Sequence, residues 1–155
     1  MRRKDREITD IQEILSVLKR CDTLRIAMNA PERPYIAAVS FGFEYASGEV
    51  SVYFHGSGKG LSAALIEENP CVCVQADIFH GYEQIAGGVT ARYESVVGFG
   101  NVKKLEGGEA AHALLKICEH CGFEGFDIET CKSFGHTAVY KIITDTLTGK
   151  RNLPK

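Results

Sequence analysis

The sequence lacks an excess of charge of either sign. Its 155 residues include 18 lysines and arginines against 20 aspartates and glutamates, a formal net charge of −2. Apart from the short basic start at residues 1–4, the basic residues are scattered along the chain. A protein whose main role is to bind nucleic acid needs a concentrated basic surface. We therefore expect no nucleic-acid partner.

Long apolar runs are also missing. No stretch approaches the roughly 20 residues that a membrane-spanning helix needs, and the charged N-terminal stretch lacks the apolar core of a secretory signal. Without such a signal, the six cysteines are expected to be reduced thiols rather than a disulfide framework. The sequence thus predicts a soluble, cytoplasmic protein with no membrane partner.

Repeats, low-complexity tracts and linkers are absent as well. A length of 155 residues suits one ordinary core, so we expect a single domain over residues 1–155. Apolar periodicity predicts helices at about residues 10–20, 59–69 and 108–121, with Thr9 as the N-cap of the first. A short helical or irregular piece is expected at 124–133.

Alternating apolar residues predict six strands, at residues 23–29, 35–45, 50–55, 71–77, 89–105 and 137–145. Residues 81–88, with paired glycines at the end, are expected to form a loop. Because short turns join most of the strands, parallel winding fits poorly. The pattern indicates an α+β domain built around a small antiparallel barrel.

The stretch "HGSGKG" at residues 55–60 has the parts of an anion site. Its glycines free backbone N–H groups, Ser57 and Lys59 add a hydroxyl and a charge, and a predicted helix begins just beyond. It matches neither a Walker loop nor a dinucleotide fingerprint, so a plain glycine turn is the alternative. His55, at the strand end beside this loop, is either structural or able to bind an anion and transfer a proton.

Cysteine and histidine spacing raises the question of a metal. Cys118 and Cys121 form a CxxC pair, and Cys131 and His136 follow in the sequence. On a helix this pair needs two further ligands, and Cys118 falls on the apolar face, so we predict no metal site. No serine, histidine and aspartate set supports a hydrolase.

Three segments taken together carry a family resemblance. They are "PYIAAVSFGFEY", "VYFHGSGKG…LIEENPCVCVQAD" and "YESVVGFGNV", in this order and at this spacing. They resemble the pyridoxamine 5′-phosphate oxidase-like FMN-binding split-barrel proteins, and within them the branch related to 5-nitroimidazole antibiotic resistance (Nim-type) proteins. The resemblance covers nearly the whole chain.

This resemblance implies a six-stranded antiparallel split β-barrel with flanking helices, mainly β, that forms a homodimer with FMN at each interface. The family's usual basic pair after the loop glycine falls on Leu61 and Ser62 here, so we expect Lys59 to supply that charge. Ser40 stands where the family has asparagine. By position, the residues expected to contact the cofactor are Val39, Ser40, Phe41, Gly42, Tyr53, Phe54, His55, Ser57, Lys59, Gly60, Ser62, Ser95 and Val96.

The resemblance also implies an activity. We expect an FMN-dependent oxidoreductase that passes reducing equivalents from NAD(P)H to a small acceptor, with a nitro-aromatic compound as one candidate, and His55 as the catalytic residue. The alternatives are a haem-binding or haem-utilisation split barrel, with His55, His80, His112 and His136 available, or a split barrel that binds F420, flavin without catalysis, or no cofactor.

Overall fold

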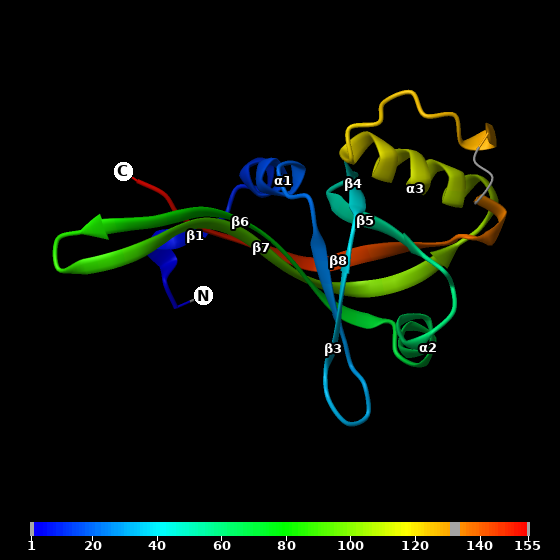
Figure 1. The fold of residues 1–155 in the computed structure, drawn as a ribbon, viewed down its shortest axis with the longest axis horizontal. Helices are drawn as coiled ribbons and strands as arrows, with labels where there is room; N and C mark the ends of the chain where they lie inside the picture. Colours follow the sequence, from blue (N-terminus) through cyan, green and yellow to red (C-terminus); the bar gives the residue numbers. More distant parts are fainter. Residues whose placement is uncertain (1, 131–133, 155) are drawn as a thin grey trace.

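The computed structural model describes residues 2–130 and 134–154. Figure 1 shows one long curved sheet with helices placed along it. Its strands in chain order are β1 (Glu7–Ile8), β2 (Leu24–Met28), β3 (Tyr35–Val39), β4 (Phe41–Ala46), β5 (Glu49–Gly56), β6 (Cys71–Ile85), β7 (Gly88–Leu105) and β8 (Ala138–Asn152). The α-helices are α1 (Ile11–Lys19), α2 (Leu61–Glu68) and α3 (Gly107–His120), and short 3₁₀ helices span Lys4–Arg6, Ile128–Thr130 and Phe134–His136.

The sheet order shows that the barrel is curled but not closed. The order is β3-β2-β6-β7-β8-β5-β4, with β1 paired to β8, and every pairing is antiparallel. β3 and β4 lie at opposite ends of this order, yet only Ser40 separates them in the chain. Since one residue spans only a few ångströms, the two edges must meet there. This open antiparallel barrel confirms the predicted α+β split-barrel fold.

The described chain has eight strands where the sequence predicts six. The predicted strand at 35–45 is divided at Ser40, because its first half pairs with β2 and its second half pairs with β5. The two-residue strand β1 accounts for the other addition. The last strand also continues beyond 145, to Asn152, along the length of β7.

The predicted loop at residues 81–88 is wrong. β6 continues to Ile85 and β7 begins at Gly88, so that only residues 86 and 87 turn the chain. The register shifts once, between Phe79 and Gly81, and Gly81 has a φ of 107°. A bulge with glycine in this conformation keeps the ladder going instead of ending it. Figure 1 shows the resulting β6–β7 arm (residues 79–95) projecting far beyond the helices.

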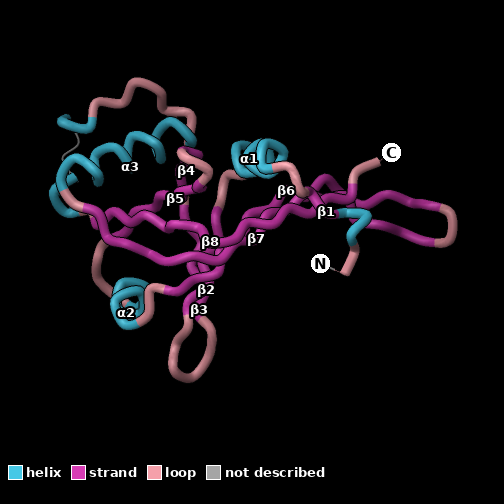
Figure 2. Tube along the Cα trace, turned by 180° about the vertical axis from the view of Figure 1, so that it is seen from behind, coloured by secondary structure: helices cyan, strands magenta, loops and turns pink. Residues whose placement is uncertain are grey.

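The helices cover the sheet from two sides. Figure 1 and Figure 2 place α1 and α3 on one side and α2 on the other. The N-cap of α1 is Asp10 and not Thr9, since the Asp10 carboxylate accepts a hydrogen bond from the Gln12 backbone N–H at 2.8 Å. No helix in the described residues is long and apolar enough to cross a membrane.

The interior contains two apolar clusters, one on each face of β5. The larger cluster fills the curled sheet and includes Val52 and Phe54 of β5. The smaller one lies beneath α3 and includes Tyr53 and Ile117. Neighbouring strand residues point to opposite faces, so α3 buries the face of β5 that the barrel leaves open.

A buried carboxylate joins α1 to the arm. The side chain of Glu94, in β7, is only 6% exposed and accepts two hydrogen bonds from Arg20, at 2.7 and 3.0 Å. His80 of β6 lies 3.0 Å from the same carboxylate. Hydrogen bonding from Arg20 lowers the pKa of Glu94, against the opposite effect of its burial. This pairing fixes the C-terminal end of α1 against the base of the arm.

We expect Glu94→Gln to lower the free energy of unfolding by about 1–3 kcal/mol at neutral pH, because the variant loses charge-assisted hydrogen bonds. The pKa of Glu94 is lower in the folded state, so its contribution is complete above about 4.5 and is lost as the pH falls further. Urea denaturation from pH 7 to pH 3 should therefore show the gap to the wild type narrowing in acid. Glu109→Gln, at an exposed carboxylate, is the control; an equal loss there would contradict this account.

Candidate cofactor site

A cavity of about 140 Å³ lies between β2, β3, the end of β5 and the start of α2. Apolar side chains from β2, β3 and α2 line it, among them Met28, Ala37 and Ile66. Six of the residues predicted for cofactor binding line it: Val39, Phe54, His55, Ser57, Lys59 and Ser62. The folded chain therefore brings together residues from three segments that the sequence could only treat separately.

The glycine loop at residues 56–60 forms one wall of this cavity through residues 56–59, whereas the predicted Gly60 is not part of the lining. Gly58 has a φ of 67°, and a side chain there would meet the Cβ atom of Ala138 at 2.8 Å, so the loop lies directly against β8. The Ser57 hydroxyl donates to the Lys59 carbonyl at 2.9 Å and accepts from the Lys59 N–H at 3.3 Å. Ser57 thus braces the turn, and Lys59 keeps its ammonium group exposed.

The N-terminus of α2 opens toward the same loop. The first helical hydrogen bond runs from the Ala64 N–H to the carbonyl of Gly60, the N-cap residue. No side chain caps this end, and the first turn has no acidic residue. The preceding N–H groups of the helix, including that of Ser62, therefore lack helical acceptors, and the helix dipole favours an anion there.

His55 is the histidine of the described chain that lines the cavity. It is exposed, its backbone pairs with Val139 of β8, and its ring forms no hydrogen bond with the described residues. The other histidines of the candidate haem set lie elsewhere: His80 contacts Glu94 and His112 contacts Glu44, while His136 is exposed in its 3₁₀ helix. Among the histidines of the described residues, only His55 can contact a molecule in this cavity.

Sequence analysis missed Tyr140, which also lines the cavity. Its ring stacks on Phe54, with ring centroids 4.9 Å apart and an angle of 15° between the planes. Burial, reinforced by the charge of Glu67, raises the pKa of Tyr140, so its hydroxyl remains a donor. The strand pattern of 137–145 was recognised, but only the register of β5 and β8 places residue 140 opposite residue 54.

Four other predicted residues lie outside the cavity lining. Ser40 is exposed at the link between the sheet edges, and the Phe41 ring is fully buried against His120 at 4.4 Å. Gly42 packs against the backbone of α3. The Tyr53 hydroxyl donates to Glu44 at 3.0 Å, and burial together with this bond raises the pKa of Tyr53 to about 12. Their cofactor role stays a prediction.

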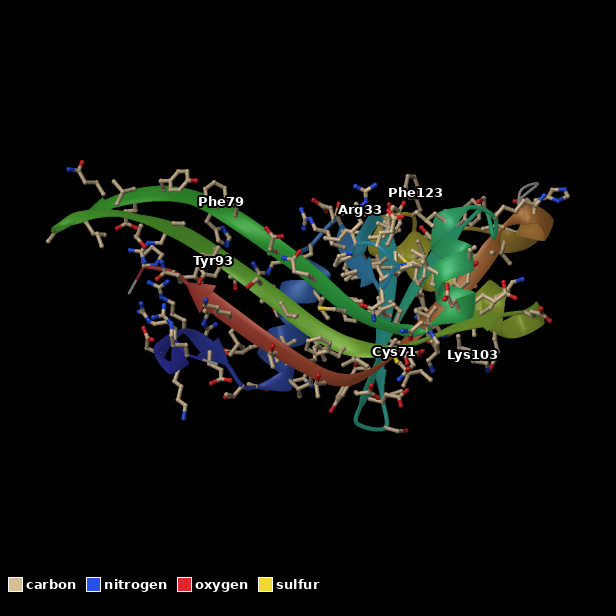
Figure 3. All side chains as sticks on the ribbon, turned by 90° about the horizontal axis from the view of Figure 1, so that it is seen from below. Arg33, Cys71, Phe79, Tyr93, Lys103 and Phe123 are labelled. Carbon is tan, nitrogen blue, oxygen red and sulfur yellow. The ribbon has the colours of Figure 1, made fainter. Side chains whose placement is uncertain are left out.

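Ser95 and Val96 lie on the arm side of β7. The Val96 side chain is buried in the core, and Ser95 is half-buried opposite Lys150. Tyr140 pairs with Lys104, nine residues along β7 from Ser95, which is roughly 30 Å at the usual rise of a strand. Figure 3 shows the labelled Tyr93 and Lys103 well apart along the sheet. Ser95 does not line the cavity of its own chain.

The cysteine pairs show no arrangement for a metal. Among residues 2–130 and 134–154, no group of three or more histidine, cysteine or acidic side chains could hold an ion. Cys118 is half-buried on α3 and Cys121 is its exposed C-cap. Cys131 lies outside the described residues.

Comparison with known proteins assigns the family. The fold and the cavity define a split barrel with a glycine loop at the mouth of a cavity. The family model described as pyridoxamine 5′-phosphate oxidase matches residues 10–151, so the chain belongs to the pyridoxamine 5′-phosphate oxidase family. No curated protein matches the chain.

Solved structures agree with this assignment. A proposed 5-nitroimidazole antibiotic resistance protein from Bacteroides thetaiotaomicron is 26% identical, with a TM-score of 0.82 over 93% of this chain and 85% of that one. This match confirms the resemblance to the nitroimidazole-resistance branch. A flavocytochrome from Azotobacter vinelandii (17% identity, TM-score 0.79, 99% of this chain and 72% of that one) shares the fold. An FAD and haem binding protein from Mycobacterium smegmatis also shares the fold (15% identity, TM-score 0.80, 96% of this chain and 74% of that one).

We expect Gly42→Ala to destabilise the protein by about 1–3 kcal/mol, because the new methyl group would overlap the Lys116 carbonyl and the backbone of α3 must move away. Thermal and urea unfolding measure this loss. Gly108→Ala, within α3 where an added methyl group meets no atom within 4 Å, should be neutral or stabilising. Equal behaviour of the two variants would rule out close packing of β4 on α3.

Proposed function

We propose that the protein binds FMN and acts as an oxidoreductase that passes reducing equivalents from NAD(P)H to a small acceptor. A nitro-aromatic compound is the candidate acceptor, in line with the B. thetaiotaomicron relative. The observation that carries the proposal is the convergence of the glycine loop, the N-terminus of α2 and His55 on one cavity. The membership of the family and two neighbours described as a flavocytochrome and an FAD and haem binding protein support a flavin.

The donor set of the cavity fits the phosphate of FMN. Lys59 supplies one positive charge, and the uncapped N–H groups at the start of α2 supply hydrogen bonds along the helix dipole. The Ser62 hydroxyl lies in the same wall. Leu61, where the family has a basic residue, is exposed and adds no charge. We therefore expect the backbone N–H groups of α2 to contribute more to phosphate binding than the single charge of Lys59 does.

The size of the cavity favours a homodimer. Cavities that hold a whole small molecule usually measure about 300–1,000 Å³, whereas this one measures about 140 Å³. A single chain thus encloses one end of FMN, and the ring has to lie outside. A second copy could cover it with Ser95, which does not line the cavity of its own chain. Exposed Phe79 and Tyr82 on the arm, in contact with each other at 5.1 Å, are suited to contacts between copies.

Few side chains are needed for the chemistry. Bound FMN would supply hydride and electron transfer, as flavins do in other proteins. A ring N–H of His55, free of partners in the described chain, would donate a proton to the acceptor at the mouth of the cavity. The Tyr140 ring, fixed by its stacking on Phe54, would keep the inner wall of the cavity apolar. Its hydroxyl group, which stays protonated, would provide one hydrogen-bond donor there.

Haem binding or haem utilisation is the second candidate function. Two similar structures are described as a flavocytochrome and an FAD and haem binding protein. Imidazole is a common axial ligand of haem iron, and the exposed His55 could serve as one. In this candidate function His55 is a ligand of haem iron and not a proton donor. Because flavin and haem absorb light differently, one absorption experiment separates the two candidate functions.

We expect the purified protein to bind FMN and to show the two absorption bands of a flavin. Lys59→Gln should weaken FMN binding about tenfold, because one charge-assisted contact to the phosphate is lost. Fluorescence quenching of FMN measures the affinity, and sedimentation velocity of the same sample reports whether it is a dimer.

The matched control is Lys19→Gln, which removes an exposed lysine of α1 outside the cavity. Its FMN affinity should equal that of the wild type. An intense Soret band on haem addition, with no FMN uptake, would favour the haem-binding candidate. Uptake of neither cofactor would exclude both.

We expect His55→Ala to lower the rate of NADPH-dependent reduction of a nitro-aromatic compound at least about a hundredfold, as removal of a proton donor does. FMN affinity should change less than about threefold, since His55 makes no structural hydrogen bond in the described chain. Steady-state kinetics and FMN titration measure the two effects, with exposed His136→Ala as the control. Unchanged turnover would leave His55 without a catalytic role.

A further inference from the structure

A larger cavity, of about 680 Å³, lies where the two ends of the described chain meet the base of the β6–β7 arm. We name it the arginine pocket. Four guanidinium groups line it, together with one carboxylate and the end of β8: Arg3, Arg6, Arg92, Arg151, Asp5, Asn152, Leu153 and Pro154. The neighbouring Tyr93 pairs with Asn152, and Figure 3 shows it beside the tip of the β8 arrow.

The guanidinium of Arg92 is held in place at the back of the arginine pocket. Its Nε donates to Glu83 at 2.6 Å, and its Nη1 donates to the Leu153 carbonyl at 3.1 Å. The side chain is only 17% exposed. Its Nη2 has no acceptor among the described residues, so one face of the group remains available to a ligand.

The other arginines retain unused donors as well. Arg151 donates through Nη2 to both carboxylate oxygens of Glu13, at 3.0 and 3.1 Å, which leaves its Nη1 and Nε without a described acceptor. Arg3 pairs with Asp5. Arg6 forms no ion pair with any described carboxylate. Three of the four arginines in the arginine pocket are thus paired with a carboxylate, and the fourth, Arg6, is not.

Tyr93, beside the arginine pocket, reports the local excess of positive charge. Lys150 lies 5.7 Å from the centre of its ring. Burial of Tyr93 would raise its pKa, but hydrogen bonding and charge from Lys150 and Arg6 outweigh burial, so that the pKa lies below its usual value. A site that stabilises a phenolate also stabilises other anions.

We propose that the arginine pocket binds the phosphate group of a small molecule, as a phosphate monoester or a diphosphate. Guanidinium groups from three segments converge there, and their planar donors match phosphate oxygens in pairs. The volume of the arginine pocket lies in the range of small-molecule sites. The scattered charge elsewhere and the net charge of −2 favour a small ligand over a nucleic acid.

Within one chain, this site is separate from the candidate cofactor site, and the contacts that define it do not depend on the proposed function. Arg92 and the cavity-lining Tyr140 are twelve residues apart along β7, since Tyr140 pairs with Lys104. That corresponds to roughly 40 Å of strand. None of the residues expected to contact FMN lines the arginine pocket.

The test is isothermal titration of the full-length protein with pyrophosphate, inorganic phosphate, AMP and succinate. Pyrophosphate or AMP should bind, and Arg6→Gln should weaken this binding at least about tenfold, because the cation without a carboxylate partner is lost. Arg33→Gln, at an exposed arginine far from Tyr93 in Figure 3, is the matched control and should bind as the wild type does. Amide shifts in an NMR titration should centre on Arg92, Tyr93 and Arg151.

Three results would overturn the proposal. One is the absence of binding by all three phosphate compounds, and another is equal binding by Arg6→Gln and Arg33→Gln. The third is a set of NMR shifts confined to the glycine loop at 56–60, which would place the phosphate in the cofactor cavity. Binding of succinate as tightly as pyrophosphate would replace phosphate by a dicarboxylate as the ligand class. Arg3→Gln repeats the measurement if Arg6→Gln does not fold.

Discussion

The passage of the chain through Ser40 is the constraint on which the rest of the structure depends. A single residue joins two strands that lie at opposite edges of the sheet, so the sheet has to curl until those edges meet. The curl puts β2 and β3 next to the end of β5 and creates the cavity at that seam. It also leaves the outer face of β5 uncovered, and α3 packs there, against Gly42 and Tyr53. The position of the cavity and the position of α3 therefore have one cause.

The same curl explains why the arm needs its own fixed point. β6 and β7 run past the closed part of the sheet, where no helix covers both of their faces. The ion pair between Arg20 and Glu94 joins the end of α1 to the base of the arm, and losing it would leave a charge on a side chain that is only 6% exposed. Beyond this point the arm exposes the aromatic residues Phe79 and Tyr82. The arm is thus held at its base by an ion pair, and its exposed aromatic residues suit the homodimer proposed above.

Sequence patterns could predict the structural elements that depend only on residues close together in the sequence. The alternation in 50–55 and the glycines after it placed the end of β5, the loop and α2 correctly. The break at Ser40 could not be predicted, because the alternation continues through it and only long-range pairing changes. Glycines at 87 and 88 indicated a loop, but pairing across 82–91 outweighed them. Tyr140 was missed for the same reason: its place opposite Phe54 follows from register, which no local pattern contains.

The two proposed anion sites would rely on different physics, and this difference bears on how the chain could use both. With Leu61 in place of a basic residue, the cofactor cavity offers one lysine and a row of backbone N–H groups that cannot move away from the helix axis. Donors of that kind are fixed before a ligand arrives, and the short-range part of their binding is weakly screened by salt. The arginine pocket instead offers long side chains, three of them already paired with carboxylates. A ligand there must compete with those pairs, so its affinity falls with ionic strength and rises with the charge of the phosphate group. The cofactor cavity is therefore suited to a permanently bound group, and the arginine pocket is suited to a molecule that exchanges.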